Sequence, residues 1–237
     1  MRLYLIRHAQ SVNNALRDER DRLQDPPLTE LGERQAEALA RHLAAGIELD
    51  PALFWEGGPP PRGYGFTRMY CSPMWRSLQT AAPVAQALDL TPQVWIDVHE
   101  QGGIYLDHAD GRGRVGYSGK TRREIAAVFP SYLLPEGIGE RGWWNRDFEE
   151  WPACYERATK VAEELRGWVA SDECIAMISH GGFLDALLKV LFNQTSNRRM
   201  FYYHYNTAIS RVDFRSDGFL EFRYLNRVSH LSPDLVS

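Results

Sequence analysis

The apolar run Leu3–Ile6 ends abruptly at Arg7 and His8, and this break is the feature that most constrains the fold. A short apolar run bounded by polar side chains is typical of a strand buried in a sheet. A strand that stops at charged residues delivers them to the end of the sheet, where open α/β sheets bind their ligands. The sequence therefore predicts that Arg7 and His8 lie at a functional edge of an α/β sheet.

Composition narrows the classes of protein that this chain can belong to. Its 237 residues are 44% hydrophobic and 24% charged, which suits a globular protein of one large domain or two small ones. The net charge of -4 and a pI near 6.0 give no general attraction to nucleic acid or to an anionic membrane. An anion site must therefore be built from a local cluster of Arg.

Three cysteines, Cys71, Cys154 and Cys174, are few and odd in number and lack the spacing of metal ligands. This favours a reducing compartment over a disulfide framework. The run Leu3–Ile6 is too short for a signal peptide, and no apolar stretch approaches the roughly 20 residues of a membrane span. We therefore expect a cytoplasmic protein with neither a nucleic acid nor a membrane as partner. The sequence leaves the oligomeric state open.

Strand and helix signals alternate along the chain. Strands are predicted at Leu3–Ile6, Phe66–Cys71, Gln93–Val98 and Cys174–Ser179, helices at Leu28–Leu43, Ser72–Leu88, Thr121–Phe129, Asp147–Ala170 and Phe183–Phe192, and a closing hairpin at Thr207–Phe214 and Phe219–Leu225. Thr29 is the expected N-cap of the first helix and Gly46 its stop. The Pro- and Gly-rich stretch 47–65 is expected to be a loop.

This alternation predicts an α/β three-layer sandwich, in which a mostly parallel central sheet carries helices on both faces. We expect one domain over residues 1–237, with an excursion at about 101–146 that forms a lid. The carboxyl ends of parallel strands meet at one edge of the sheet. Four segments should converge there, and they carry Arg7 with His8, Arg76, Glu100 and His180.

Two His, two Arg and one carboxylate at a common edge suit phosphoryl transfer through a covalent intermediate. A neutral imidazole is a nucleophile, and two guanidinium groups match phosphate oxygens and offset the charge of the transition state. The helix N-termini after Ser72 and at Gly181-Gly182 would add backbone N–H donors. Glu100 is the carboxylic acid available to protonate the leaving oxygen. This scheme requires neither a metal nor a cofactor.

Four motifs in the chain resemble those of one known family. The stretch from Arg7 to Asn14 looks like the pattern Arg-His-Gly-x-Thr-x-x-Asn, with Ala9 in place of Gly and Ser11 in place of Thr. The supporting motifs are Pro27–Ala36, Ser72–Ala81 and Ser179–Gly182. Together they resemble the histidine phosphatase superfamily, which is phosphoglycerate mutase-like, and they occur in that family's order over most of the chain.

The resemblance implies a role for each matched residue. His8 would be the nucleophile that becomes phosphohistidine, and Glu100 the acid that later activates water. The implied phosphate-binding residues are Arg7, Ser11, Asn14, Arg76, His180 and Gly181. Ser11 and Asn14 could instead only form the turn, and four neighbours of Glu100 remain alternative acids: Asp97, His99, Asp107 and His108.

The function that we expect is hydrolysis of a phosphomonoester, with a small phosphorylated metabolite or inorganic phosphate as the bound molecule. A phosphoglycerate mutase is the first alternative. Mutases of the family carry Arg-His-Tyr-Gly and then Gly-Leu-Asn-Lys after the acid, whereas this chain has the segment Gln101–Tyr105, Gln-Gly-Gly-Ile-Tyr. The second alternative, a non-catalytic binder of phosphorylated ligands, would be expected to lack the nucleophile or the acid.

Two further features have competing interpretations. Cys71 precedes Arg76 somewhat as the thiolate of a cysteine phosphatase precedes its phosphate-binding Arg, but four residues separate the two where that loop needs five. The basic residues from Arg112 to Arg123 suit a solvated surface better than a site for a second acidic group of the substrate.

Overall fold

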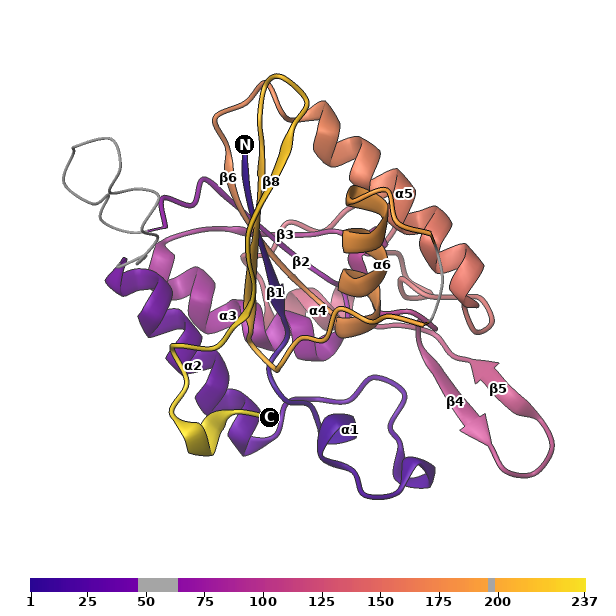
Figure 1. The fold of residues 1–237 in the computed structure, drawn as a ribbon. Helices are drawn as coiled ribbons and strands as arrows, with labels where there is room; N and C mark the ends of the chain where they lie inside the picture. Colours follow the sequence, from indigo (N-terminus) through magenta and orange to yellow (C-terminus); the bar gives the residue numbers. More distant parts are fainter. Residues whose placement is uncertain (47–63, 196–198) are drawn as a thin grey trace.

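The computed structural model describes residues 1–46, 64–195 and 199–237, and a six-stranded sheet lies at its centre (Figure 1). The strands are β1 (Arg2–Arg7), β2 (Arg68–Cys71), β3 (Pro92–Val94), β6 (Cys174–Ser179), β7 (Ile209–Phe214) and β8 (Leu220–Arg227). Their spatial order is β3-β2-β6-β1-β7-β8. The first four are parallel, and β7 and β8 form the expected antiparallel hairpin. The predicted mostly parallel sheet is confirmed.

Helices cover both faces of this sheet, which makes the fold a three-layer α/β sandwich (Figure 1). Helices α2 (Glu30–Ala45) and α3 (Trp75–Leu88) lie on one face, and α5 (Trp151–Gly167) and α6 (Gly181–Leu191) lie on the other. Side chains of a strand alternate between faces, so Tyr4 packs with the first pair of helices and Leu5 with the second. This double burial explains why β1 is a continuous apolar run.

The long surface helix α2 begins and ends as its sequence predicts. The hydroxyl of Thr29 accepts a hydrogen bond from the backbone N–H of Gly32 at 3.0 Å, and it caps the first turn. Gly46 closes the helix with a φ of 69°, a conformation that suits glycine. The predicted loop at 47–65 lies almost entirely outside the described residues.

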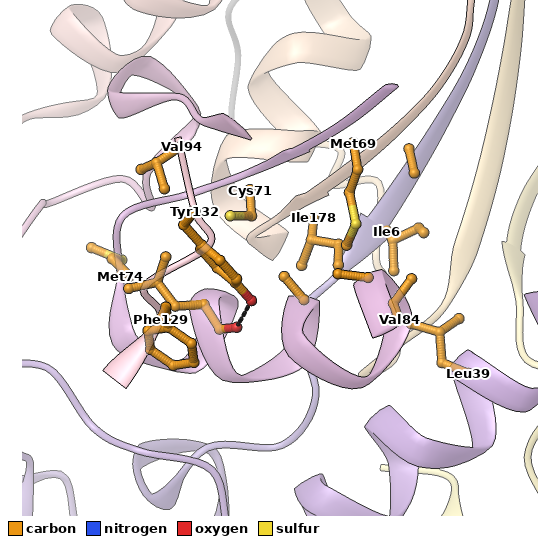
Figure 2. Packing of buried hydrophobic residues seen from close by; sticks show 14 of the residues in the cluster. Ile6, Leu39, Met69, Cys71, Met74, Val84, Val94, Phe129, Tyr132 and Ile178 are labelled. Atoms are coloured by element: carbon orange, nitrogen blue, oxygen red, sulfur yellow. Dashed lines mark hydrogen bonds between the residues drawn. The ribbon is translucent and has the colours of Figure 1, made fainter. Parts of the chain in front are cut away.

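The segment between Gln101 and Arg146 holds a short hairpin and one helix. These are β4 (Tyr105–His108), β5 (Gly113–Gly116) and α4 (Arg122–Val128). The sequence predicted α4 but not the hairpin. Figure 2 shows Phe129 and Tyr132 of this segment packed beside Met74, and the Tyr132 hydroxyl donates to the carbonyl oxygen of Leu78 on α3 at 2.9 Å. That the segment acts as a lid stays a prediction.

Several predicted element boundaries differ from those in the structure, and three of them lie near the predicted site. The third strand stops at Val94, and Ile96–Val98 forms a 3₁₀ turn, η3, that leaves the sheet. Helix α3 begins at Trp75 rather than Pro73, because the Ser72 hydroxyl accepts from the N–H of Met74 and holds a turn. Helix α5 begins at Trp151, four residues later than predicted.

The remaining short elements are α1 (Val12–Ala15), η1 (Glu19–Asp21) and η4 (Pro233–Leu235). No helix in the described part of the chain has the length and apolar character needed to cross a membrane.

Candidate active site

The predicted convergence of strand ends is present in the structure. Parallel pairing continues beyond β1, because the N–H of His8 donates to the carbonyl oxygen of Ser179 at 2.9 Å. It also continues beyond β2, where the N–H of Ser72 donates to the carbonyl oxygen of Ile178 at 3.1 Å. These bonds bring His8 beside His180, with ring centroids 4.9 Å apart.

The hydrogen bonds of His8 leave its Nε2 atom unprotonated. Nδ1 lies 2.6 Å from the carbonyl oxygen of Ala9, which can only accept, so Nδ1 carries the proton. Arg76 Nε then donates to His8 Nε2 at 3.1 Å. Burial, with the nearby Arg76 and Arg7, holds the pKa of His8 well below 6.5. The imidazole is therefore neutral at pH 7, the form that acts as a nucleophile.

Arg76 is the second residue of α3, and a buried carboxylate lies beside it. Its Nη1 is 3.8 Å from Oδ1 of Asp25, and the same oxygen accepts from the backbone N–H of Trp75 at 3.0 Å. Burial raises the pKa of Asp25 to about 6, against the opposing effect of Arg76. Asp25 therefore helps to orient the guanidinium that reaches His8.

Two buried nitrogens beside His8 make no hydrogen bond to any residue that the structure describes. They are Nε of Arg7 and Nδ1 of His180. One other nitrogen of each side chain is held, because Arg7 Nη1 donates to the carbonyl oxygen of His204 at 2.6 Å and His180 Nε2 lies 2.7 Å from the Ser72 hydroxyl. Buried polar groups nearly always have a partner. The oxygens of a bound phosphate would satisfy both nitrogens.

Glu100 follows η3, and its carboxylate accepts hydrogen bonds from the N-terminus of α6, the helix that begins after His180. Its Oε1 accepts from the N–H groups of Phe183 and Gln101, both at 2.9 Å, and its Oε2 accepts from that of Gly182 at 3.2 Å. A carboxylate at a helix N-terminus is stabilised by the helix dipole. The prediction that the Gly182 amide faces the phosphate is therefore wrong, because that amide donates to Glu100. Gly181 lies against Arg7.

The family model described as histidine phosphatase superfamily (branch 1) matches residues 3–54 and 60–226. This chain belongs to the histidine phosphatase superfamily.

One relative of known sequence and two solved structures illustrate what this chain is similar to. A probable phosphoglycerate mutase of Yersinia pestis is 24% identical over 231 residues, covering 93% of this chain and 88% of that protein. A phosphoserine phosphatase of Entamoeba histolytica, solved with 3-phosphoglyceric acid, has 18% identity and a TM-score of 0.58 and covers 98% of this chain and 99% of its own. A mycobacterial glucosyl-3-phosphoglycerate phosphatase has 19% identity and a TM-score of 0.58, covering 96% and 99%. At these identities the solved structures show a shared fold.

Among the candidate acids of this superfamily member, Glu100 is the one that bonds to the amides of α6. His99 bonds through Nδ1 to the carbonyl oxygen of Ile96, and Asp97 lies one turn earlier in η3. Asp107 and His108 lie on the β4–β5 hairpin, where they contact Arg114 and Tyr117. The assignment of Glu100 as the acid stays a prediction.

Ser11 and Asn14 bond to each other rather than to the His8 ring. The N–H and hydroxyl of Ser11 donate to Asn14 Oδ1 at 3.1 and 3.0 Å and cap α1. Asn206 Nδ2 donates to the His8 carbonyl oxygen at 2.9 Å and lies 3.4 Å from Asn14 Oδ1. Their direct role in binding phosphate stays a prediction.

Cys71 is fully buried in β2, and burial alone raises the pKa of its thiol far above the ordinary value. A thiol in that state is not the nucleophile of a cysteine phosphatase. The basic stretch is largely neutralised on the surface, where Arg112 pairs with Asp110 and Lys120 with Glu124. The described part of the chain brings together no group of three His, Cys, Asp or Glu side chains that could hold a metal ion.

A cavity of about 550 Å³ has Asp25 in its wall, the residue that also lies beside Arg76. Its walls mix both signs of charge, since they include Arg22, Asp25, Lys120 and Glu124. Asp25 belongs both to this wall and to the surroundings of Arg76. Sequence reasoning missed Asp25, and the only available signal was its place directly before Pro26 in the loop that precedes α2.

Proposed function

We propose that this chain hydrolyses phosphomonoesters through a phosphohistidine intermediate on His8, without a metal ion. The observation that carries the proposal is the state of His8: a neutral ring with its proton on Nδ1 and its Nε2 lone pair held by Arg76 Nε at 3.1 Å. Arg7 and His180 offer buried nitrogens that have no hydrogen-bond partner among the described residues. An unprotonated ring nitrogen with donors for phosphate oxygens suits nucleophilic attack on phosphorus.

In the first step the Nε2 lone pair of His8 forms a bond to phosphorus, and the bond from phosphorus to the ester oxygen breaks. Arg76 exchanges its hydrogen bond with Nε2 for one with a phosphoryl oxygen and, with Arg7, offsets the growing charge. Glu100 transfers a proton to the leaving oxygen, so an alcohol departs.

In the second step the Glu100 carboxylate takes a proton from water while the water oxygen attacks phosphorus. The bond between phosphorus and Nε2 breaks, and the electron pair returns to the imidazole. Inorganic phosphate leaves, and both His8 and Glu100 regain their starting forms. No redox cofactor enters this balance.

The substrate that we propose is a small phosphorylated metabolite. The solved phosphatases with this fold include ones named for phosphoserine and for glucosyl-3-phosphoglycerate, which are polar and of modest size. The cavity of about 550 Å³ beside Asp25 suits the alcohol part of such a molecule. A panel of sugar phosphates, phosphoglycerates, nucleotides and phosphopeptides ranked by kcat/KM identifies the class.

Mutase activity is a second candidate, because the Yersinia relative carries that name. A mutase must shield its phosphohistidine from water until the phosphoryl group returns to a second oxygen. Conversion of 3-phosphoglycerate to 2-phosphoglycerate, measured with and without a bisphosphoglycerate primer, separates the two activities. We expect release of inorganic phosphate to exceed isomerisation.

The deciding experiment for the proposed function uses the His8→Ala variant. Wild-type protein in EDTA is expected to hydrolyse para-nitrophenyl phosphate and to form a phosphoenzyme that acid destroys and base preserves. His8→Ala is expected to lose both. Appreciable turnover by His8→Ala refutes the proposal, and absence of hydrolysis by the wild type favours a non-catalytic binder.

A further inference from the structure

The backbone that leads into Glu100 is held by buried side chains rather than by strand pairing. The chain leaves the sheet after β3, so the three carbonyl groups before Glu100 need other donors. Each has one: Arg157 Nη1 donates to the carbonyl oxygens of Asp97 at 2.6 Å and His99 at 2.9 Å, and the Ser179 hydroxyl donates to that of Val98 at 2.7 Å. The approach to Glu100 is therefore fixed from α5 and β6.

Arg157 is itself locked in place by Glu149. Its Nε and Nη2 donate to the two carboxylate oxygens of Glu149 at 2.9 and 2.5 Å, in a bidentate pair with both side chains over 90% buried. Burial alone would raise the pKa of Glu149, but hydrogen bonds from Arg157 and His99 lower it to about 2. The pair is therefore charged at neutral pH.

Glu149 also forms hydrogen bonds with the residues that follow Glu100 in the chain. Its backbone N–H donates to the carbonyl oxygen of Gly102 at 3.2 Å, and its carbonyl oxygen accepts from the Gln101 side chain. The pair thus contacts the residues before Glu100 and the residues after it. A guanidinium offers a rigid fork of donors, which suits this simultaneous contact.

Arg157 touches the other partner of Glu100 as well. Its guanidinium carbon lies 4.6 Å from the ring centroid of Phe183, the residue whose N–H donates to Glu100 Oε1 at 2.9 Å. Arg157 therefore contacts both the segment that leads to Glu100 and the end of α6 to which the Glu100 carboxylate bonds.

We propose that the Arg157–Glu149 pair is a positioning device that aims the Glu100 carboxyl group at the ester oxygen of the substrate. This inference rests on the proposed function, because it assumes that Glu100 donates a proton. The competing view is that the pair only stabilises the fold. Buried ion pairs can often be replaced by apolar residues at little cost in stability, so stability alone does not explain such a pair.

The two views differ in how activity should depend on the leaving group. The ester 2,4-dinitrophenyl phosphate releases a stable anion that needs no proton, whereas phenyl phosphate releases a poor leaving group that does. The ratio kcat/KM reports only the steps up to formation of the phosphoenzyme. Comparing the two esters by kcat/KM therefore isolates proton donation from nucleophilic attack and phosphate binding.

The variants are Arg157→Met and the double variant Arg157→Met with Glu149→Leu, which leaves no unpaired buried charge. Arg166→Met, an exposed position on the same helix, is the matched control. We expect kcat/KM for phenyl phosphate to fall about 10 to 100 times more than that for 2,4-dinitrophenyl phosphate in both variants. The control is expected to leave both values unchanged. An equal loss on the two esters, or no loss, overturns the proposal.

Amide hydrogen exchange gives a second measure that needs no activity. In the wild type the N–H groups of Gly182 and Phe183 are protected by Glu100, and we expect them to exchange at least about tenfold faster in the double variant. Amides of β1 should keep their protection. Unchanged exchange at Gly182 and Phe183 contradicts the positioning role even if His8→Ala were to disprove phosphoryl transfer, so failures of the two proposals remain distinguishable.

Discussion

The substitution Gly182→Ala adds one methyl group and should strongly reduce activity while it changes the free energy of unfolding only a little. An added Cβ would lie 2.6 Å from Oε1 of Glu100 and 3.4 Å from the Trp151 ring. Reaching an ordinary contact of 3.4 Å requires the oxygen to move by about 0.8 Å, the difference between 3.4 and 2.6 Å. A shift of that size weakens the 2.9 Å bond from the Phe183 N–H beyond hydrogen-bond range.

The effects on stability are small and oppose each other. Weakening a hydrogen bond to a charged group costs about 1.5 to 3 kcal/mol. Replacing Gly by Ala in a helix contributes up to about 1 kcal/mol in the favourable direction. We therefore expect the free energy of unfolding to fall by no more than about 3 kcal/mol. Removal of a general acid, in contrast, costs about 10² to 10⁴-fold in rate.

The assay is kcat/KM for phenyl phosphate, accompanied by urea unfolding of the same preparations. Gly182→Ala should lose at least about 100-fold on phenyl phosphate while it remains folded. The control is Gly167→Ala at the end of α5, where an added Cβ meets nothing within 4 Å. A folded Gly182→Ala enzyme with wild-type activity on phenyl phosphate would refute the assignment of Glu100 as the acid.

Two further predictions concern Asp25, which the sequence analysis did not assign to the site, and the cysteines, which a cysteine-phosphatase mechanism would need. The folded-state pKa of Asp25 is about 6 against 3.8 as the ordinary value, so the folded protein keeps this proton longer than the unfolded chain. Burying the charged form therefore destabilises the protein as pH rises from about 4 to above 6, by up to about 3 kcal/mol. Asp25→Asn keeps an acceptor for the Trp75 N–H and should lose this pH dependence. If the free energies of unfolding of wild type and variant, measured in urea, change equally across that pH range, the prediction is wrong. Iodoacetamide should neither label the native protein nor reduce its hydrolysis of para-nitrophenyl phosphate, because Cys71, Cys154 and Cys174 are all buried; inactivation that tracks alkylation contradicts this.

The residues that sequence reasoning placed correctly are those that follow directly from strand order. His8 and His180 each come after the last residue of a buried parallel strand, and Arg76 lies in the first turn after another. Parallel strands align their carboxyl ends, so chain order alone predicts that such residues meet. The same rule predicted that a strand leads directly to Glu100. In the structure β3 ends at Val94, and the 3₁₀ turn η3 lies between it and Glu100.

The contacts that sequence reasoning missed join residues far apart in the chain. Asp25 bonds to the Trp75 N–H across 50 positions, Ser72 to His180 across 108, and Asn206 to the His8 carbonyl oxygen across 198. No periodicity or local propensity encodes these pairs, since they depend on the path of the chain in three dimensions. The same limit explains why the Gly182 amide was assigned to phosphate.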